Sequence, residues 1–176
     1  MNSDEIKIVR ASIPDANLLV DLAAETFIQS HASSASKKDI DAYVNEKYTV
    51  SIMAAELNKP DNLYHLLFYK NKPIGFSKII LNEAHPNINN TKVTKLERLY
   101  ILNEYHDLKL GRALFEFNVK LSKKSQQNGM WLFVWVDNLR AFNFYVKCGF
   151  TIIGSHDFRI SDTHTNPNHQ MLLLYE

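Results

Sequence analysis

The segment LERLYILNEYHDLKLGRAL, residues 96–114, shows how the rest of the chain is organised. Its first part belongs to an apolar run that predicts a strand over Val93–Leu102. Its last part begins a helix predicted over Leu110–Gln126, where apolar residues recur at i, i+3, i+4 and i+7. A strand that leads into a helix through a short turn directs the free N–H groups of the first helical turn at one point, where the helix dipole adds partial positive charge. This connection is therefore a candidate site for a pyrophosphate.

Three residues of the turn favour such a ligand. Gly111 lets the backbone approach closely, and Lys109 and Arg112 supply positive charge. An ordinary strand–helix connection that contains one glycine fits this segment equally well.

Hydrophobic periodicity predicts the remaining elements. The predicted strands are Ile6–Val9, Leu63–Tyr69, Pro73–Leu81, Trp131–Val136, Phe150–Gly154 and Gln170–Tyr175. The predicted helices are Asp15–Ile28, one or two helices within Lys37–Asn58, and Leu139–Lys147, with polar loops at His31–Ser36, Asn82–Thr91 and Asp157–Asn168. Because the apolar run 131–136 follows a helix, we expect a buried strand parallel to the preceding one. The pattern indicates one α/β domain over residues 1–176.

Composition narrows the functional class. The 20 Lys and Arg residues balance 19 Asp and Glu residues, which argues against nucleic-acid binding. Cys148 is the single cysteine, which excludes an internal disulfide, and no run approaches the roughly 18 apolar residues of a membrane span. We therefore expect a cytoplasmic protein without a membrane segment. The His and Asp residues near the C-terminus match no metal-ligand spacing, so no metal is predicted; they are His156, Asp157, Asp162, His164 and His169.

A second segment, residues 138–150, makes the first more informative. Together the two segments resemble the GNAT superfamily of acetyl-CoA-dependent N-acetyltransferases. The later family pattern is met at Asn138, Ala141, Phe144, Tyr145, Gly149 and Phe150. Residues 96–101, together with 154–158 and Met171, are most similar to the PaiA-like branch, whose relatives acetylate spermidine and spermine.

This resemblance implies a fold and a reaction. The fold is a mixed, mostly antiparallel sheet of about seven strands, with a parallel central pair and flanking helices. The reaction is direct attack of a primary amine on acetyl-CoA in a ternary complex, with a small amine acceptor, a polyamine being one candidate. The resemblance is compatible with a monomer or a homodimer.

The resemblance also implies which residues hold the co-substrate. Aligning Gly111 with the second glycine of the family motif places His106 at the Gln/Arg position and Lys109 at the first glycine, where a positive φ is required. The alternative alignment places Leu108 at the Gln/Arg position. The expected cofactor-binding residues are Leu99, Tyr100, Ile101, His106, Asp107, Leu108, Lys109, Leu110, Gly111, Arg112, Asn138 and Lys147.

Two residues are candidates for catalysis. Tyr145 is the expected general acid, although it could simply pack the short helix against the sheet. Glu97 is the expected base, acting through water, since strict alternation would place it on the same strand face as Val93, Leu99 and Ile101. Burial there would raise its pKa to a useful range. The competing interpretation makes Glu97 an ion-pair partner of Lys95 or Arg98.

Other interpretations stay open at this point. His31, Glu25, Asp39 and Asp41 lie on elements that line the acceptor cleft in relatives and could attract a polyamine, or they could be a solvated surface. The acceptor could instead be a peptide N-terminus, an aminoglycoside or another small amine. Because Lys109 replaces a motif glycine, a degenerate acyl-CoA sensor without turnover is a further possibility.

Overall fold

A computed structural model describes residues 5–176 of the chain. It contains seven strands, five α-helices and two short 3-10 helices. They are β1 (Ile6–Arg10), η2 (Ile13–Asp15), α1 (Ala16–His31), α2 (Lys37–Lys47), α3 (Val50–Leu57), β2 (Asn62–Tyr69), β3 (Lys72–Ile80), β4 (Val93–Ile101), η3 (Asn103–Leu108), α4 (Leu110–Lys124), β5 (Gly129–Trp135), α5 (Leu139–Lys147), β6 (Thr151–Arg159) and β7 (Thr165–Leu174).

The strands form one sheet in the order β1-β2-β3-β4-β5-β7-β6. Every neighbouring pair is antiparallel except β4 and β5, which run parallel because α4 connects them. This arrangement confirms the predicted mixed, mostly antiparallel sheet of seven strands with a central parallel pair.

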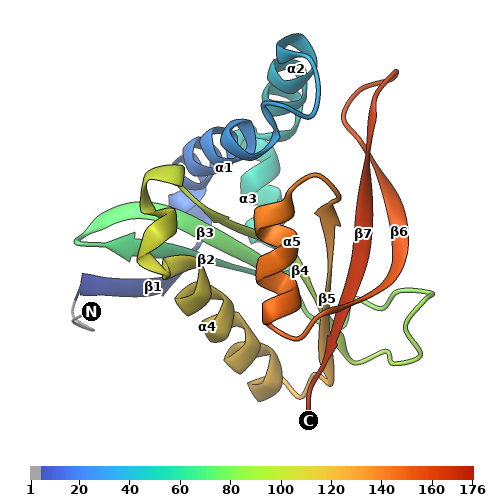
Figure 1. Cartoon of the computed structure of the whole chain (residues 1–176). Coiled ribbons are helices and arrows are strands. Elements are labelled where there is room, and N and C mark those ends of the chain that lie inside the picture. Colours follow the sequence, from blue (N-terminus) through green and yellow to red (C-terminus); the bar gives the residue numbers. More distant parts are fainter. Residues whose placement is uncertain (1–4) are drawn as a thin grey trace.

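Helices cover both faces of the sheet, as Figure 1 shows. Helices α1, α2 and α3 pack on one face, where Leu66 and Phe76 point toward them. Helix α4 packs on the other face against Leu67 and Ile74, and α5 lies on that side over β5. Adjacent residues such as Leu66 and Leu67 thus serve different cores, because successive side chains of a strand point to opposite faces. None of the helices in the described part of the chain is long and apolar enough to cross a bilayer.

The central parallel pair is short. Strands β4 and β5 pair only from Val93 opposite Gly129 to Lys95 opposite Trp131. Beyond this point β5 continues to pair with β7 as far as Trp135, and β4 continues to pair with β3 as far as Ile101. The two central strands therefore diverge, and the sheet opens between them.

Two boundaries differ from the sequence predictions. The predicted loop 157–168 is wrong, because β6 and β7 form a long hairpin with its turn between Arg159 and Thr165. Polar side chains hid these strands: Asn166 and Gln170 are buried, so their pattern is not that of a solvated loop. Helix α1 also extends to His31, which was assigned to the following loop.

The region Lys37–Asn58 forms two helices rather than one. Ser36 and Thr49 begin them, since each side chain accepts a hydrogen bond from the backbone N–H three residues later. The cap at Thr49 shows that this region contains two helices, whereas periodicity alone allowed one or two.

Gly75 permits the close pairing of β3 with β4. A Cβ atom there would press on the carbonyl oxygen of Tyr100 and lie 2.7 Å from Cδ1 of Ile101. We expect Gly75→Ala to lower the free energy of unfolding by about 1–3 kcal/mol, as overpacking does elsewhere. Urea denaturation measures this difference.

Gly111→Ala is the matched control, because its added Cβ would lie 3.6 Å from Ile101, an ordinary contact. We expect this variant to unfold at a urea concentration equal to or above that of the parent, since alanine favours a helix by about 1 kcal/mol over glycine. Equal stability of the two variants would contradict the assignment.

Candidate active site

The diverging strands β4 and β5 line a cleft of about 1000 Å³. Residues of α1, α2, β6 and Phe133 of β5 line one part of it, and residues of η3, α4 and α5 line another. The size suits a ligand site, since ligand clefts typically enclose about 300–1,000 Å³. The cleft thus joins two chemically different regions across the edge of β4.

Strand β4 directs free backbone N–H groups toward β5. The N–H of Leu102 donates to the carbonyl of Ile74 at 2.9 Å, and the register from Ser77 opposite Leu99 to Gly75 opposite Ile101 is regular. Because hydrogen-bonded positions alternate in an antiparallel pair, the N–H groups of Leu99 and Ile101 point away from β3. They face the side on which β5 has diverged, and both residues line the cleft.

The N-terminus of α4 lies at the same cleft. No side chain caps this helix, and its N-cap residue Lys109 has φ 56° and ψ 17°, as the alignment with a motif glycine predicted. Lys109, Gly111 and Arg112 line the cleft, whereas Leu110 is 0% exposed and anchors the first turn in the core. The turn therefore offers free N–H groups, a helix dipole and two cations to an anion.

The remaining residues of the connection differ in position. His106 lines the cleft, and its Nε2 lies 2.8 Å from the carbonyl oxygen of Ile101, which ties η3 to the end of β4. Asp107 contacts Arg140 at 3.4 Å. Asp107, Leu108 and Leu110 do not line the cleft, so the turn brings together only part of the predicted set.

Helix α5 contributes to the opposite wall. Asn138 caps it, since its Oδ1 accepts from the N–H of Ala141 at 3.1 Å, and its amide nitrogen stays available to a ligand. Asn138 and Lys147 both line the cleft, at the two ends of the helix.

Tyr145 lies on the same helix and also lines the cleft. Its side chain is 9% exposed and packs edge-on against Phe144 and Phe150. Burial, aided by the neighbouring Tyr100, raises the pKa of Tyr145 well above its usual value. The phenol thus keeps its proton at neutral pH. On the same side of the molecule, burial also raises the pKa of the Cys148 thiol above its usual value.

The strand face predicted for Glu97 is only partly correct: Glu97 lies on the face of Val93 and Lys95, whereas Leu99 and Ile101 lie on the opposite face. The register between β3 and β4 shifts at this point: Lys78 pairs with Arg98 and Ile79 with Leu96, which leaves Glu97 as the extra residue of a β-bulge. Leu99 and Ile101 consequently point toward α4. Glu97 and Arg98 instead both lie on the face that carries Lys95, Tyr100 and the helices α1–α3.

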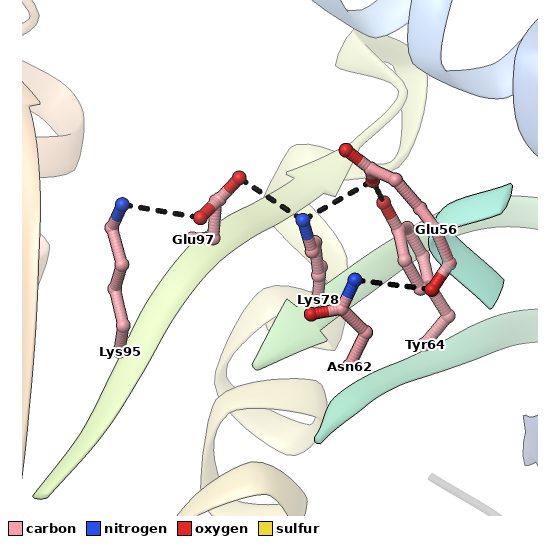
Figure 2. A network of polar contacts seen from close by, with 6 residues as sticks. All are labelled: Glu56, Asn62, Tyr64, Lys78, Lys95 and Glu97. Carbon is pink, nitrogen blue, oxygen red and sulfur yellow. Dashed lines mark hydrogen bonds and ion pairs between the residues drawn. The ribbon is translucent and has the colours of Figure 1, made fainter. Parts of the chain in front are cut away.

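Glu97 belongs to a chain of ion pairs, shown in Figure 2. One oxygen lies 3.1 Å from the ammonium of Lys78, and the other lies 3.1 Å from Lys95. Lys78 is 3% exposed and also bonds Glu56 at 3.1 Å, which in turn accepts from the hydroxyl of Tyr64. Burial acts to raise the pKa of Glu97, but Lys78 and Lys95 outweigh it and the net pKa lies below the usual value. The predicted upward shift is therefore wrong, because the sequence does not reveal two lysines at this carboxylate.

Glu97 also reaches a second cavity. This cavity encloses about 520 Å³ and is lined by Lys78, Glu83 and Asn82 among others. Glu97 lines both cavities, so its carboxylate stands between the main cleft and a second opening that could hold water.

Sequence reasoning missed most of the residues in the part of the cleft lined by α1, α2, β5 and β6, here called the acceptor side because the acceptor amine is expected there. Of the acceptor candidates named from the sequence, His31 lines it, whereas Glu25, Asp39 and Asp41 do not. The missed residues include Tyr43, Tyr48, Lys95, Arg98, Phe133, Trp135, His156 and Phe158. Trp131, Phe133 and Trp135 alternate along one predicted strand, a signal that could have located this wall. Within residues 5–176, no group of three His, Cys, Asp or Glu side chains is placed to hold a metal ion.

Comparison with known proteins identifies the family. The acetyltransferase (GNAT) family matches residues 20–150, which include most of the residues that line the cleft, the α4 turn and Tyr145. The chain belongs to the GNAT acetyltransferase family. It is thus an acetyl-CoA-dependent N-acetyltransferase.

Relatives of this acetyltransferase cover nearly its whole length. A spermidine N(1)-acetyltransferase of Thermoplasma acidophilum is 30% identical over 84% of the chain and 89% of the relative. An uncharacterised N-acetyltransferase of Lactobacillus delbrueckii is 25% identical over 89% and 91%. The crystal structure of the PaiA N-acetyltransferase from Thermoplasma acidophilum in complex with coenzyme A superposes with a TM-score of 0.77, at 26% identity, over 97% of this chain and 99% of that one.

The replacement of a motif glycine by Lys109 can be tested on coenzyme A binding. We expect Lys109→Gly and Lys109→Ala each to weaken binding several-fold, since both remove a charge from the end of the cleft where we expect the diphosphate, and such a contact is worth about 1 kcal/mol. Isothermal titration with coenzyme A measures the dissociation constants.

The same pair separates charge from backbone strain. Lys109 is left-handed, which costs a non-glycine residue roughly 1–2 kcal/mol, so Lys109→Gly should unfold at a higher temperature than Lys109→Ala. Tighter coenzyme A binding by Lys109→Gly would mean that the ammonium contributes nothing and that only the backbone matters.

Proposed function

We propose that this GNAT acetyltransferase transfers the acetyl group from acetyl-CoA to a primary amine by direct attack within a ternary complex. The observation that supports this most is the divergence of β4 from β5. It places the free N–H groups of Leu99 and Ile101, the uncapped N-terminus of α4 and the Tyr145 side chain around one cleft.

The residues of the donor half fit acetyl-CoA. The N–H groups at the start of α4, with Lys109 and Arg112, suit the diphosphate, and Asn138 suits the amides of the pantetheine arm. The co-substrate supplies an activated thioester. The N–H of Leu99 or Ile101 donates to the thioester carbonyl, and a preorganised donor of this kind is worth about 3 kcal/mol in other enzymes.

The acceptor must lose a proton before it can attack. An alkyl ammonium has a pKa of about 10, so most of it is protonated at neutral pH. Lys95 and Arg98 line the cleft beside Glu97, and positive neighbours favour the neutral form of an amine. The acceptor half thus helps the amine to bind in its reactive, uncharged state.

We assign the transfer of the proton to Glu97, acting through water. Its low pKa makes it a weak base toward a free ammonium, but the N–H proton becomes strongly acidic once the nitrogen has begun to bond to the carbonyl carbon. The second cavity beyond Glu97 gives this proton a route to bulk water.

Tyr145 completes the reaction as the general acid. The C–N bond forms, the C–S bond breaks, and the phenol gives its proton to the departing thiolate. A buried phenol with a raised pKa keeps this proton available at neutral pH. The products are the N-acetylated amine and coenzyme A with a free thiol.

The identity of the acceptor amine is also a proposal. The relative from Thermoplasma acidophilum is named for spermidine, which makes a polyamine one candidate. A peptide N-terminus or another small amine is equally compatible with the reaction chemistry.

Tyr145→Phe tests the assignment of the acid. We expect the rate of coenzyme A thiol release with an accepted amine to fall about 10²–10³-fold, as general acid losses do, while coenzyme A binds with unchanged affinity. A thiol-reactive dye follows release, and titration follows binding. Phe144→Leu is the control for altered packing on α5. Binding of coenzyme A without thiol release for any amine, in the parent protein, would instead indicate an acyl-CoA sensor.

Lys78→Met tests Glu97. Removing an ammonium that lies 3.1 Å from the carboxylate should raise the pKa of Glu97, so the acidic limb of the kcat/KM profile should move to higher pH. Lys95→Met removes the other, more exposed partner and should move the limb in the same direction. Lys72→Met, on the exposed start of β3, should leave the profile unchanged. An unmoved limb in both test variants would show that Glu97 is not the titrating base.

A further inference from the structure

The charge of the cleft bears on which amine it accepts. Among the described residues that line it, Glu97 is the sole carboxylate. Lys95 and Arg98 line the acceptor side next to it, and Arg112, Lys109, Arg140 and Lys147 line the donor side. The donor-side cations face the phosphates of acetyl-CoA in the proposed complex, but Lys95 and Arg98 still outnumber Glu97 on the acceptor side, which disfavours a ligand with several ammonium groups.

The negative charge of Glu97 is already paired. Lys78 and Lys95 each lie 3.1 Å from one of its two oxygens, as Figure 2 shows. Glu56, the second carboxylate of the network, bonds Lys78 and Tyr64. Neither carboxylate is free to hold the distal ammonium groups of a polyamine.

Aromatic rings, by contrast, form much of the acceptor wall. Phe27 stacks between His31 and Tyr43, with ring centroids 4.2 and 4.6 Å away, and His31 stacks toward Trp135 at 6.2 Å. Phe27, His31, Tyr43 and Trp135 form a row, here called the aromatic row, that runs from α2 across α1 to β5. Burial lowers the pKa of His31, so this ring is uncharged at neutral pH.

The aromatic row is not arranged to bind cations. Phe27 is 2% exposed and stacks against His31 and Tyr43, so its ring is occupied by neighbouring rings and is not open to a ligand cation. Two further rings that line the cleft already contact a cation of the protein: Lys95 lies 5.8 Å from the centroid of Phe133, and Arg98 lies 5.0 Å from that of Tyr48. Ring edges attract the electron-rich face of another aromatic group rather than an ammonium.

We therefore propose that the acceptor is a primary monoamine with an aromatic body, which carries one positive charge in solution and loses it in the cleft. Its ring packs against the aromatic row, and its amino group lies near Glu97 and the free N–H groups of β4. This inference depends on the proposed acetyl transfer, and it narrows the acceptor to arylalkyl monoamines rather than polyamines.

A panel of matched amines tests this proposal. Thiol release from acetyl-CoA is measured with phenethylamine, propylamine and spermidine. We expect kcat/KM to be highest for phenethylamine, exceeding both spermidine and propylamine by at least about tenfold, since a buried aromatic group contributes about 1–3 kcal/mol. Higher kcat/KM with spermidine would overturn the inference and leave the acetyltransferase function intact. No release with any amine, although coenzyme A binds, would overturn the proposed function itself.

A variant of the aromatic row provides a second test. Trp135→Leu removes a ring that lines the cleft and stacks toward His31. We expect kcat/KM to fall about tenfold for phenethylamine and less than about twofold for propylamine, which lacks a ring to pack there. An equal fall for both amines would show that the row does not contact the acceptor. Thermal unfolding confirms that the variant is folded during the assay.

Discussion

The separation of β4 from β5 after three paired residues is the constraint on which the rest of the site depends. Each central strand keeps its outer partner, β3 or β7, so neither can move to close the gap. The backbone groups that would have paired across a complete sheet are left without a strand partner at the cleft. A ligand that supplies hydrogen bonds there replaces a missing strand, which explains why the donor site contains so much main chain.

The bulge at Glu97 produces the second asymmetry of the site. It turns an acidic and a basic side chain, Glu97 and Arg98, to the same face of β4, and it turns Leu99 and Ile101 to the face covered by α4. The first pair reaches the acceptor side, and the second pair anchors the strand against Leu110 and Leu114. The one extra residue of the bulge thus places the charged side chains on one face of β4 and the apolar side chains that follow on the other.

The fold could be predicted well from the sequence, because long apolar periodicities specify the elements and one specific motif, from Asn138 to Phe150, specifies their arrangement. The elements of the donor half could be predicted for the same reason, including the left-handed Lys109, although Asp107, Leu108 and Leu110 of the predicted set do not line the cleft. The acceptor half could not. Its side chains come from α1, α2, β5 and β6, which are distant in the sequence, and the bulge that aims Glu97 breaks the alternation on which the prediction relied. The distal part of the β6–β7 hairpin was also missed, because its buried polar residues have the composition of a loop.

The two halves of the cleft differ in how firmly they are held. Leu110 and Leu114 fix the start of α4 within a closed core, so the donor half exists before anything binds. Beside the acceptor half, the turn of the β6–β7 hairpin meets the segment after α1 through Nε2 of His164 and the carbonyl oxygen of Ser34, 2.6 Å apart, and through Ile160, which packs in the same core as Ala35. Surface loops held by few contacts open locally at a lower cost in free energy than a packed core does. In the proposed ternary complex, the conformational entropy lost on binding would therefore fall mainly on the acceptor step, which favours an order of addition in which acetyl-CoA enters first.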